Sequence, residues 1–199
     1  MYEFTETILI EAPPTRVWEV MSDIGGWWGA ASPEHQSMEF LDGSGVRVGA
    51  KIRIREKVAG MPGEAAAVVT AVRPGSAVTW ESPEARYQWH GFPTTISEGV
   101  TLGIEPCEGA ASTQVSARVW ALFPLGLLGS AVRWAFARPL NGIEKDREHV
   151  RTELRHLKRL IETGDGSCRQ FDHRQGQCPE QCPVSADRRH LCRDIGDTE

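Results

Sequence analysis

Few residues in this sequence have the type and spacing that chemistry needs, and Glu98 is the first of them. It lies in TISEGVTLGIEP (residues 95–106), where apolar and polar residues alternate as they do in a strand with one buried face. Alternation places the Glu98 carboxyl among apolar side chains, where it could act as an acid, a base or a ligand anchor. The alternative, which we favour, is that Gly99 forms a bulge that turns Glu98 back to water.

Two further side chains could carry a proton or a charge. His90 in RYQWHGF could be a proton carrier near an opening, but no matching partner accompanies it. Arg118 in STQVSARVWALF either covers the outer surface of a sheet or reaches a carboxylate inside it. Cys107 has no recognisable nucleophile setting. The sequence contains no G-x-S-x-G, phosphate-binding glycine loop or H-E-x-x-H, so hydrolase, nucleotide-dependent and zincin functions have no motif support.

The segment 164–199 carries four cysteines in the spacing C-x9-C-x3-C-x9-C, at positions 168, 178, 182 and 192. It has few large apolar residues, so we expect a polar tail that is irregular or disordered. A second interpretation is a zinc site formed by Cys178, Cys182, His190 and Cys192. A third is a pair of nested disulfides, although Pro179 and Pro183 disagree with a helical hairpin. No other cofactor is expected.

Composition describes an ordinary globular chain. The 199 residues are 40% hydrophobic and 25% charged, which is enough for one sizeable core. The formal net charge of -5 argues against a nucleic-acid partner. We find neither the pattern of a signal peptide nor a run of about 18 apolar residues, so we expect no transmembrane segment and a cytoplasmic location.

The first elements that must position these residues are a strand and a short helix. YEFTETILIE (residues 2–11) alternates as a strand with one wet face, and the two prolines after it suit the first turn of a helix over 13–23. Gly25 and Gly26 are expected to end that helix. Trp27 and Trp28 would then lie on a glycine-rich turn.

A long antiparallel meander follows, because strand-like segments alternate with turn signals such as DGSG and RPGS. In KIRIREKV the apolar Ile52 and Ile54 alternate with basic residues, which we interpret as a solvated outer face. The expected strands cover residues 37–45, 51–58, 63–72, 77–82, 86–92, 95–106 and 112–123.

The last part of the main domain is helical by its periodicity. One apolar stripe runs through Ile143, Val150, Leu154, Leu157 and Ile161. A glycine at position 164 is a natural C-terminal stop. The preceding segment, 125–137, is apolar on nearly all sides, which favours deep burial over attachment to a membrane surface.

Taken in order, these segments resemble the START-related polyketide cyclase/dehydrase and lipid-transport superfamily (SRPBCC). The resemblance rests on ILIEAPPTRVWEVMSDIGGW, then VTLGIEP with the turn GAASTQV, then the long helix, and it covers residues 1–163. It implies an α+β helix-grip fold, in which a curved antiparallel sheet of six or seven strands wraps around a long C-terminal helix. Two short helices would follow the first strand.

A helix-grip fold leaves an apolar pocket, because one helix stripe cannot fill the whole concavity of a twisted sheet. Trp18 would anchor the short helices on the sheet, with Trp27 and Trp28 near the mouth of the pocket as part of a gate. Plain packing is the alternative for each tryptophan. The expected pocket residues are Trp18, Trp27, Trp28, Ile52, Ile54, Trp80, Trp89, Glu98, Val100, Leu102 and Trp134.

Three functions remain open at this point. The first is binding or transport of a small hydrophobic ligand, such as a lipid or an aromatic or polyketide-like compound. The second is an aromatase/cyclase or dehydratase acting in the same cavity, with Glu98, His90 and Arg118 as the candidate catalytic residues. The third is an interaction module for a protein partner. The sequence does not decide whether the chain forms a homodimer.

Overall fold

A computed structural model of the chain describes residues 1–43, 45–89, 92–109 and 111–164. The chain divides into two units, Met1–Thr163 and Gly164–Glu199, and only the first is described in detail. The predicted catalytic candidate His90 and the predicted zinc ligands Cys178, Cys182, His190 and Cys192 therefore lie outside the described residues. Of the helices in the described part of the chain, none combines the length and apolar character needed to span a membrane.

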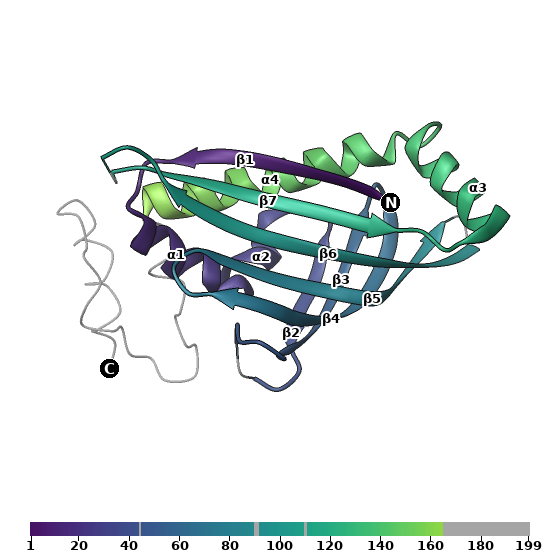
Figure 1. Ribbon diagram of the computed structural model, residues 1–199, viewed down its shortest axis with the longest axis horizontal. Helices are drawn as coiled ribbons and strands as arrows, with labels where there is room; N and C mark the ends of the chain where they lie inside the picture. Colours follow the sequence, from purple (N-terminus) through teal and green to yellow (C-terminus); the bar gives the residue numbers. More distant parts are fainter. Residues whose placement is uncertain (44, 90–91, 110, 165–199) are drawn as a thin grey trace, which may run out of the picture. The chain divides into compact units, whose positions relative to one another are not determined.

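A seven-stranded antiparallel sheet forms the body of the first unit, in the order β1-β7-β6-β5-β4-β3-β2 (Figure 1). From β2 to β7 each strand pairs with the next along the chain, while β1 joins the far edge by pairing with β7. The strands are β1 (Tyr2–Ile10), β2 (His35–Phe40), β3 (Lys51–Val58), β4 (Met61–Arg73), β5 (Ala77–Trp89), β6 (Phe92–Pro106) and β7 (Thr113–Leu122).

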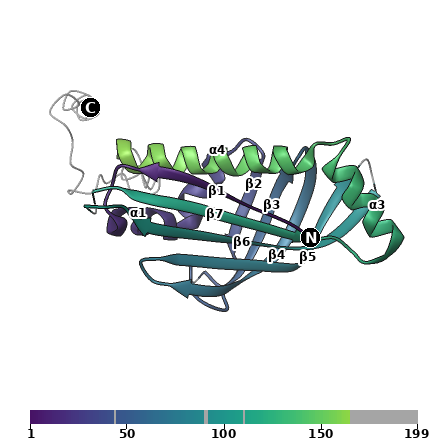
Figure 2. The ribbon, with the colours of Figure 1, turned by 45° about the horizontal axis from the view of Figure 1, so that its top comes forward.

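Four helices accompany the sheet: α1 (Pro14–Ser22), α2 (Ile24–Ala31), α3 (Gly126–Ala137) and α4 (Gly142–Thr163). The long helix α4 runs along the sheet, with α1 and α2 near its C-terminal half and α3 beyond its N-terminal end (Figures 1 and 2). This arrangement is the α+β helix-grip fold that the sequence predicts.

The predicted turn around Trp27 and Trp28 is wrong, because both residues belong to α2 and are buried. Residues Ile24, Trp27, Trp28 and Ala31 are the buried positions of α2, and their spacing is that of one helix face. Burial of this face outweighs the low helix propensity of the glycines at positions 25 and 26.

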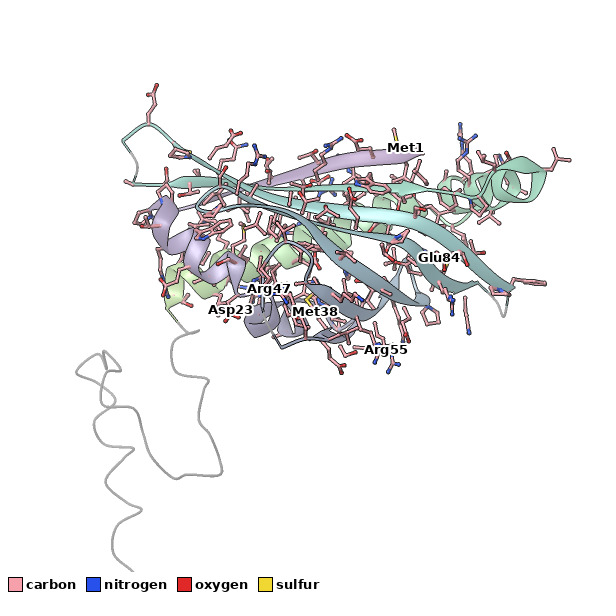
Figure 3. All side chains as sticks on the ribbon, turned by 60° about the horizontal axis from the view of Figure 1, so that its bottom comes forward. Met1, Asp23, Met38, Arg47, Arg55 and Glu84 are labelled. Carbon is pink, nitrogen blue, oxygen red and sulfur yellow. The ribbon has the colours of Figure 1, made fainter. Side chains whose placement is uncertain are left out.

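The two faces of the sheet differ as the alternation in β3 predicts. Ile52 and Ile54 are buried, while the basic residues between them are exposed. Arg55 points outward from the sheet (Figure 3), and its Nε donates a hydrogen bond to Glu64 of β4 at 2.9 Å. The basic stripe is therefore a solvated outer face with acidic neighbours.

Helix α4 carries the predicted apolar stripe toward the core, with Val150, Leu154, Leu157 and Ile161 buried. The predicted deep burial of the segment 125–137 is only partly correct. Ala135 and Phe136 of α3 are buried, but the side chains at the other side of this helix and just before it are not. The most exposed are Leu125 (99%), Leu127 (93%) and Trp134 (64%).

Candidate functional site

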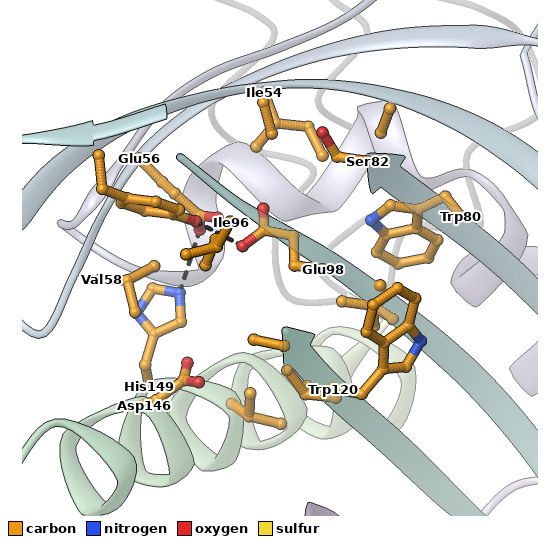
Figure 4. A pocket seen from close by; sticks show the side chains of 18 of the residues that line it. Ile54, Glu56, Val58, Trp80, Ser82, Ile96, Glu98, Trp120, Asp146 and His149 are labelled. Atoms are coloured by element: carbon orange, nitrogen blue, oxygen red, sulfur yellow. Dashed lines mark hydrogen bonds and ion pairs between the residues drawn. The ribbon is translucent and has the colours of Figure 1, made fainter. Parts of the chain in front are cut away.

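A cavity of about 110 Å³ lies between the concave face of the sheet and α4 (Figure 4). This volume holds several water molecules or part of a small organic molecule. Aromatic and aliphatic side chains make up most of its wall, and polar groups gather toward α4. The apolar wall includes Trp27, Trp28, Ile54, Trp80, Val100 and Leu102.

Seven of the eleven predicted pocket residues line this cavity, the six just named and Glu98. Ile52 does not, because it is fully buried among other core side chains. Trp18 packs half-buried against the core from α1, and Trp134 lies on the exposed side of α3. The side chain of Trp89 lies outside what the structure describes.

The two tryptophans of α2 are held in place by polar contacts. The indole Nε1 of Trp27 donates a hydrogen bond to the carbonyl oxygen of Met21 at 3.2 Å. The Trp28 ring stacks on the imidazole of His35, with ring centroids 3.5 Å apart and planes 8° from parallel. Both rings therefore form a fixed part of the wall.

Glu98 faces the cavity, and the predicted bulge at Gly99 is wrong. Strand β6 keeps its register with β7 through this position, and the irregularity lies on β5 between Ser82 and Ala85. The missing Cβ of Gly99 instead admits the Trp120 ring, which an ideal Cβ would meet at 2.6 Å. Glycine at this position thus reflects close packing and leaves the Glu98 side chain on the inner face.

The Glu98 carboxyl is kept neutral at neutral pH by its surroundings. Burial, together with the negative charges of Glu56 and Asp146, raises its pKa to about 8, although the hydrogen bond from Tyr87 acts in the opposite direction. The Tyr87 hydroxyl donates that bond to Oε2 at 2.9 Å. A carboxylic acid that faces an apolar cavity can donate a hydrogen bond or a proton to a ligand.

Ser82 lies directly across from Glu98 on the neighbouring strand. Its side chain lines the cavity and is 2% exposed. The hydroxyl Oγ has no hydrogen-bond partner among the described residues. A buried hydroxyl without a partner is costly, so this atom is available to a polar group of a ligand.

A second acid–tyrosine pair lies on the α4 side of the cavity. The Tyr2 hydroxyl donates a hydrogen bond to Oδ2 of Asp146 at 2.8 Å. Burial raises the pKa of Asp146 to about 7, against the hydrogen bond from Tyr2, with a further increase from the charge of Glu56. Asp146 thus adds a second group that changes protonation near neutral pH.

Two histidines and two glutamates meet at the junction of α4, β2 and β3. The Nε2 atoms of His35 and His149 are 3.0 Å apart. Oε1 of Glu153 lies 3.0 Å from Nε2 of His35 and 3.6 Å from Nε2 of His149. Oε2 of Glu56 lies 3.9 Å and 3.5 Å from the same two nitrogens. We call these four residues the histidine–glutamate cluster; imidazole and carboxylate groups are ligands for divalent metals.

Charge dominates the chemistry of this cluster. Burial by itself lowers the pKa of His149, but the contacts with Glu56, Glu153 and Glu34 outweigh it and raise the pKa to about 9. His149, Glu56 and Glu153 also line the cavity, so the cluster is part of its wall. Figure 4 shows His149 and Glu56 facing each other there.

Arg118 is not part of the site. Its guanidinium forms two hydrogen bonds with Glu3 of β1, at 2.9 and 3.0 Å, on the exposed surface of the sheet. Of the two positions that the sequence leaves open for Arg118, the structure shows the outer one.

Residues 1–162 match the family model described as polyketide cyclase/dehydrase and lipid transport. The chain belongs to this family. No curated protein sequence matches it.

Solved structures share the fold at low sequence identity. The Zhui aromatase/cyclase from Streptomyces sp. R1128 is 15% identical, with a TM-score of 0.61, over 81% of this chain and 93% of its own. A protein from Thermus thermophilus is 18% identical, with a TM-score of 0.59, over 82% and 99% of the two chains. A START superfamily protein from Mycobacterium smegmatis is 16% identical, with a TM-score of 0.53 and the same coverage.

The polar residues of this family member's cavity are the ones that the sequence analysis missed. On α4, Asp146, His149 and Glu153 occupy positions in phase with the apolar stripe, which is a signal that could have been used. His35 and Ser82 carry no such signal, because each is a single polar residue in a strand segment.

Proposed function

We propose that the protein binds a small, largely apolar molecule that carries at least one polar group, inside the cavity between the sheet and α4. The observation that carries this proposal is the Ser82 hydroxyl, buried in an apolar wall without a partner among the described residues and opposite the neutral acid of Glu98. A hydroxyl or carbonyl group of a ligand would satisfy both side chains. Family membership supports hydrophobic ligands in general.

Apolar contact supplies most of the expected affinity. Burial of apolar surface contributes roughly 25 cal/mol per Å², so a ligand that buries about 300 Å² gains about 7 kcal/mol before entropic costs. The two polar groups would add specificity, because a ligand without a matching group leaves Ser82 unpaired.

The test is native mass spectrometry of the protein purified from its own host, followed by extraction and identification of the bound molecule. A Val100→Phe variant should lose that molecule, because the added ring occupies the cavity that Val100 lines. Thr95→Phe is the matched control, since Thr95 is exposed on the same strand. Empty wild-type protein in repeated preparations, or equal occupancy in Val100→Phe, would contradict the proposal.

A second candidate function is acid catalysis in the same cavity, as in a cyclase or dehydratase. It is favoured by Glu98, an acid with a pKa of about 8 that faces the ligand space. In a dehydration, Glu98 would protonate the leaving hydroxyl, and pocket shape would hold the reactive chain in a folded conformation.

This second candidate is tested with a linear polyketide-like thioester as substrate. Glu98→Gln should abolish formation of the cyclised or dehydrated product while the variant still binds the substrate in native mass spectrometry. Turnover that is unchanged in Glu98→Gln would remove Glu98 as the acid, and absence of turnover in the wild type would leave binding alone.

A further inference from the structure

The histidine–glutamate cluster has the dimensions of a metal site. Its four donor atoms come from β2, β3 and α4, and the five measured distances between them range from 3.0 to 3.9 Å. In a tetrahedral site with bonds of about 2.1 Å, neighbouring donors lie about 3.4 Å apart. The cluster therefore surrounds a point that one divalent ion could occupy with little movement of the side chains.

Outer hydrogen bonds orient both imidazoles toward that point. Nδ1 of His35 lies 2.5 Å from the carbonyl oxygen of Trp28, which can only accept a hydrogen bond. Nδ1 of His149 lies 2.9 Å from a carboxylate oxygen of Glu34. Each Nδ1 therefore carries the proton, and in the neutral rings both Nε2 lone pairs face the centre of the cluster. Metal-binding histidines typically show this pattern of outer partners.

The charges around the point also call for a cation. Two nitrogen lone pairs only 3.0 Å apart repel each other unless a proton or a metal ion lies between them. Glu34, Glu56 and Glu153 add three carboxylates, and no lysine or arginine forms an ion pair with any of them among the described residues. Both His35 and His149 are buried, so water screens these charges little.

We propose that His35, His149, Glu56 and Glu153 bind a divalent transition-metal ion in the wall of the cavity. Two imidazoles with two carboxylates suit ions such as Zn²⁺ and Co²⁺, and they do not suit Mg²⁺ or Ca²⁺, which prefer oxygen donors alone. Glu56 has the longest distances to the histidines, so it is the ligand most readily replaced by a polar group from the cavity. This proposal does not depend on the proposed function.

The experiment is a Co²⁺ titration of the metal-free full-length chain, followed by visible absorption and equilibrium dialysis. Co²⁺ also reports the ligand type, because thiolate ligands produce a near-ultraviolet charge-transfer band and a nitrogen–oxygen site does not. We expect about one equivalent bound without that band. A variant with the four tail cysteines changed to serine should bind the same amount.

Variants of the cluster make the test specific. His149→Gln and Glu153→Gln should each weaken Co²⁺ binding by at least about 10- to 100-fold, while His156→Gln on the same helix should not. Glu34→Ala removes only the outer hydrogen bond to His149 from a partly exposed position, and should weaken binding by about 10-fold or more. It provides the answer even if a buried variant fails to fold.

Three results would overturn the proposal. The first is a wild-type chain that binds no Co²⁺ or Zn²⁺, which would mean that a proton alone holds the two histidines together. The second is binding that disappears when only the tail cysteines are changed. The third is unchanged affinity in folded His149→Gln or Glu34→Ala protein.

Discussion

Single side chains decide what the cavity can recognise, and Ser82 is the clearest case. Its hydroxyl is buried and unpaired within the described part of the chain, while the Glu98 carboxyl on the next strand is neutral near pH 7. A protein without a ligand gains nothing from such a pair. The pair is therefore better explained as a recognition element than as part of the core.

Ser82→Ala should change stability and binding in opposite directions. Removing the unpaired hydroxyl should stabilise the ligand-free protein by about 1 kcal/mol, measured by denaturant unfolding. Loss of one hydrogen bond should weaken ligand binding by about 2- to 10-fold, measured by titration of the extracted ligand. Ser97→Ala is the control, because Ser97 donates a hydrogen bond to the Pro83 carbonyl at 2.8 Å and should only destabilise the fold.

Glu98 should make the stability of the protein depend on pH. Its folded-state pKa of about 8 lies above the ordinary value of 4.5, so the folded chain binds more protons than the unfolded chain between these pH values. Stability from this group is complete below about pH 4.5 and is lost as the pH rises through about 8. The groups that act on it are Tyr87, Glu56 and Asp146.

Replacing Glu98 with Gln should remove this part of the pH dependence. We expect the difference in unfolding free energy between wild type and Glu98→Gln to move in favour of the variant as the pH rises from about 5 to about 8. Glu105→Gln changes an exposed glutamate of the same strand and should leave the wild-type slope intact. A parallel pH profile for wild type and Glu98→Gln would show that Glu98 is already ionised in the folded protein.

The orientation of Glu98 shows where sequence reasoning stops at the residue scale. Alternation along β6 placed the side chain on the correct face, but a glycine next to it suggested a bulge. The actual reason for that glycine is the Trp120 ring of β7, a contact between strands that no pattern within one strand can show. The same limit applies to His35, which meets His149 from 114 positions away.

At the scale of elements, local preference misled where burial decides the structure. Segment 24–31 contains three glycines and was expected to be a turn, yet it forms α2. Its helical spacing of Ile24, Trp27, Trp28 and Ala31 was present in the sequence and outweighed propensity. The segment at 126–137 forms the expected helix, α3, but it is covered on one side only, so Trp134 remains exposed.

Gly99→Ala tests how tightly β6 and β7 pack. A methyl group there would meet the Trp120 ring at 2.6 Å, so the ring must move into the cavity that it lines. We expect a loss of about 1 to 3 kcal/mol in unfolding free energy and a shift in tryptophan fluorescence. Gly103→Ala on the same strand meets only the Ser116 hydroxyl, at 3.0 Å, and should cost less. Equal effects of the two variants would contradict this account.

The whole first unit was predictable because its segments follow a known order. The antiparallel meander, the pairing of helices with the sheet and the long terminal helix all agree with the helix-grip fold that the sequence predicts. The chemistry of the cavity was not predictable in the same way. It arises where β2, β3, β5, β6 and α4 converge, and only the three-dimensional arrangement brings those side chains together.

A chain that ends at Thr163 should fold and keep the cavity. The family match ends at residue 162, and the last turn of α4 is held by the buried Ile161 and by Glu162, which accepts a hydrogen bond from the Glu11 amide at 2.7 Å. We expect an unfolding free energy within about 1 kcal/mol of the full chain and the same bound molecule in native mass spectrometry. Loss of either would assign the tail a structural role.

A hollow core also makes the protein its own detector. A molecule that fills the space between the sheet and α4 binds only the folded chain, so it raises the unfolding free energy by about 2.7 kcal/mol at about 100 times its Kd. In a domain of this size, that change corresponds to an increase of roughly 5 to 10 °C in melting temperature. A calorimetric screen of chemical libraries could therefore find the natural guest before anyone knows its structure.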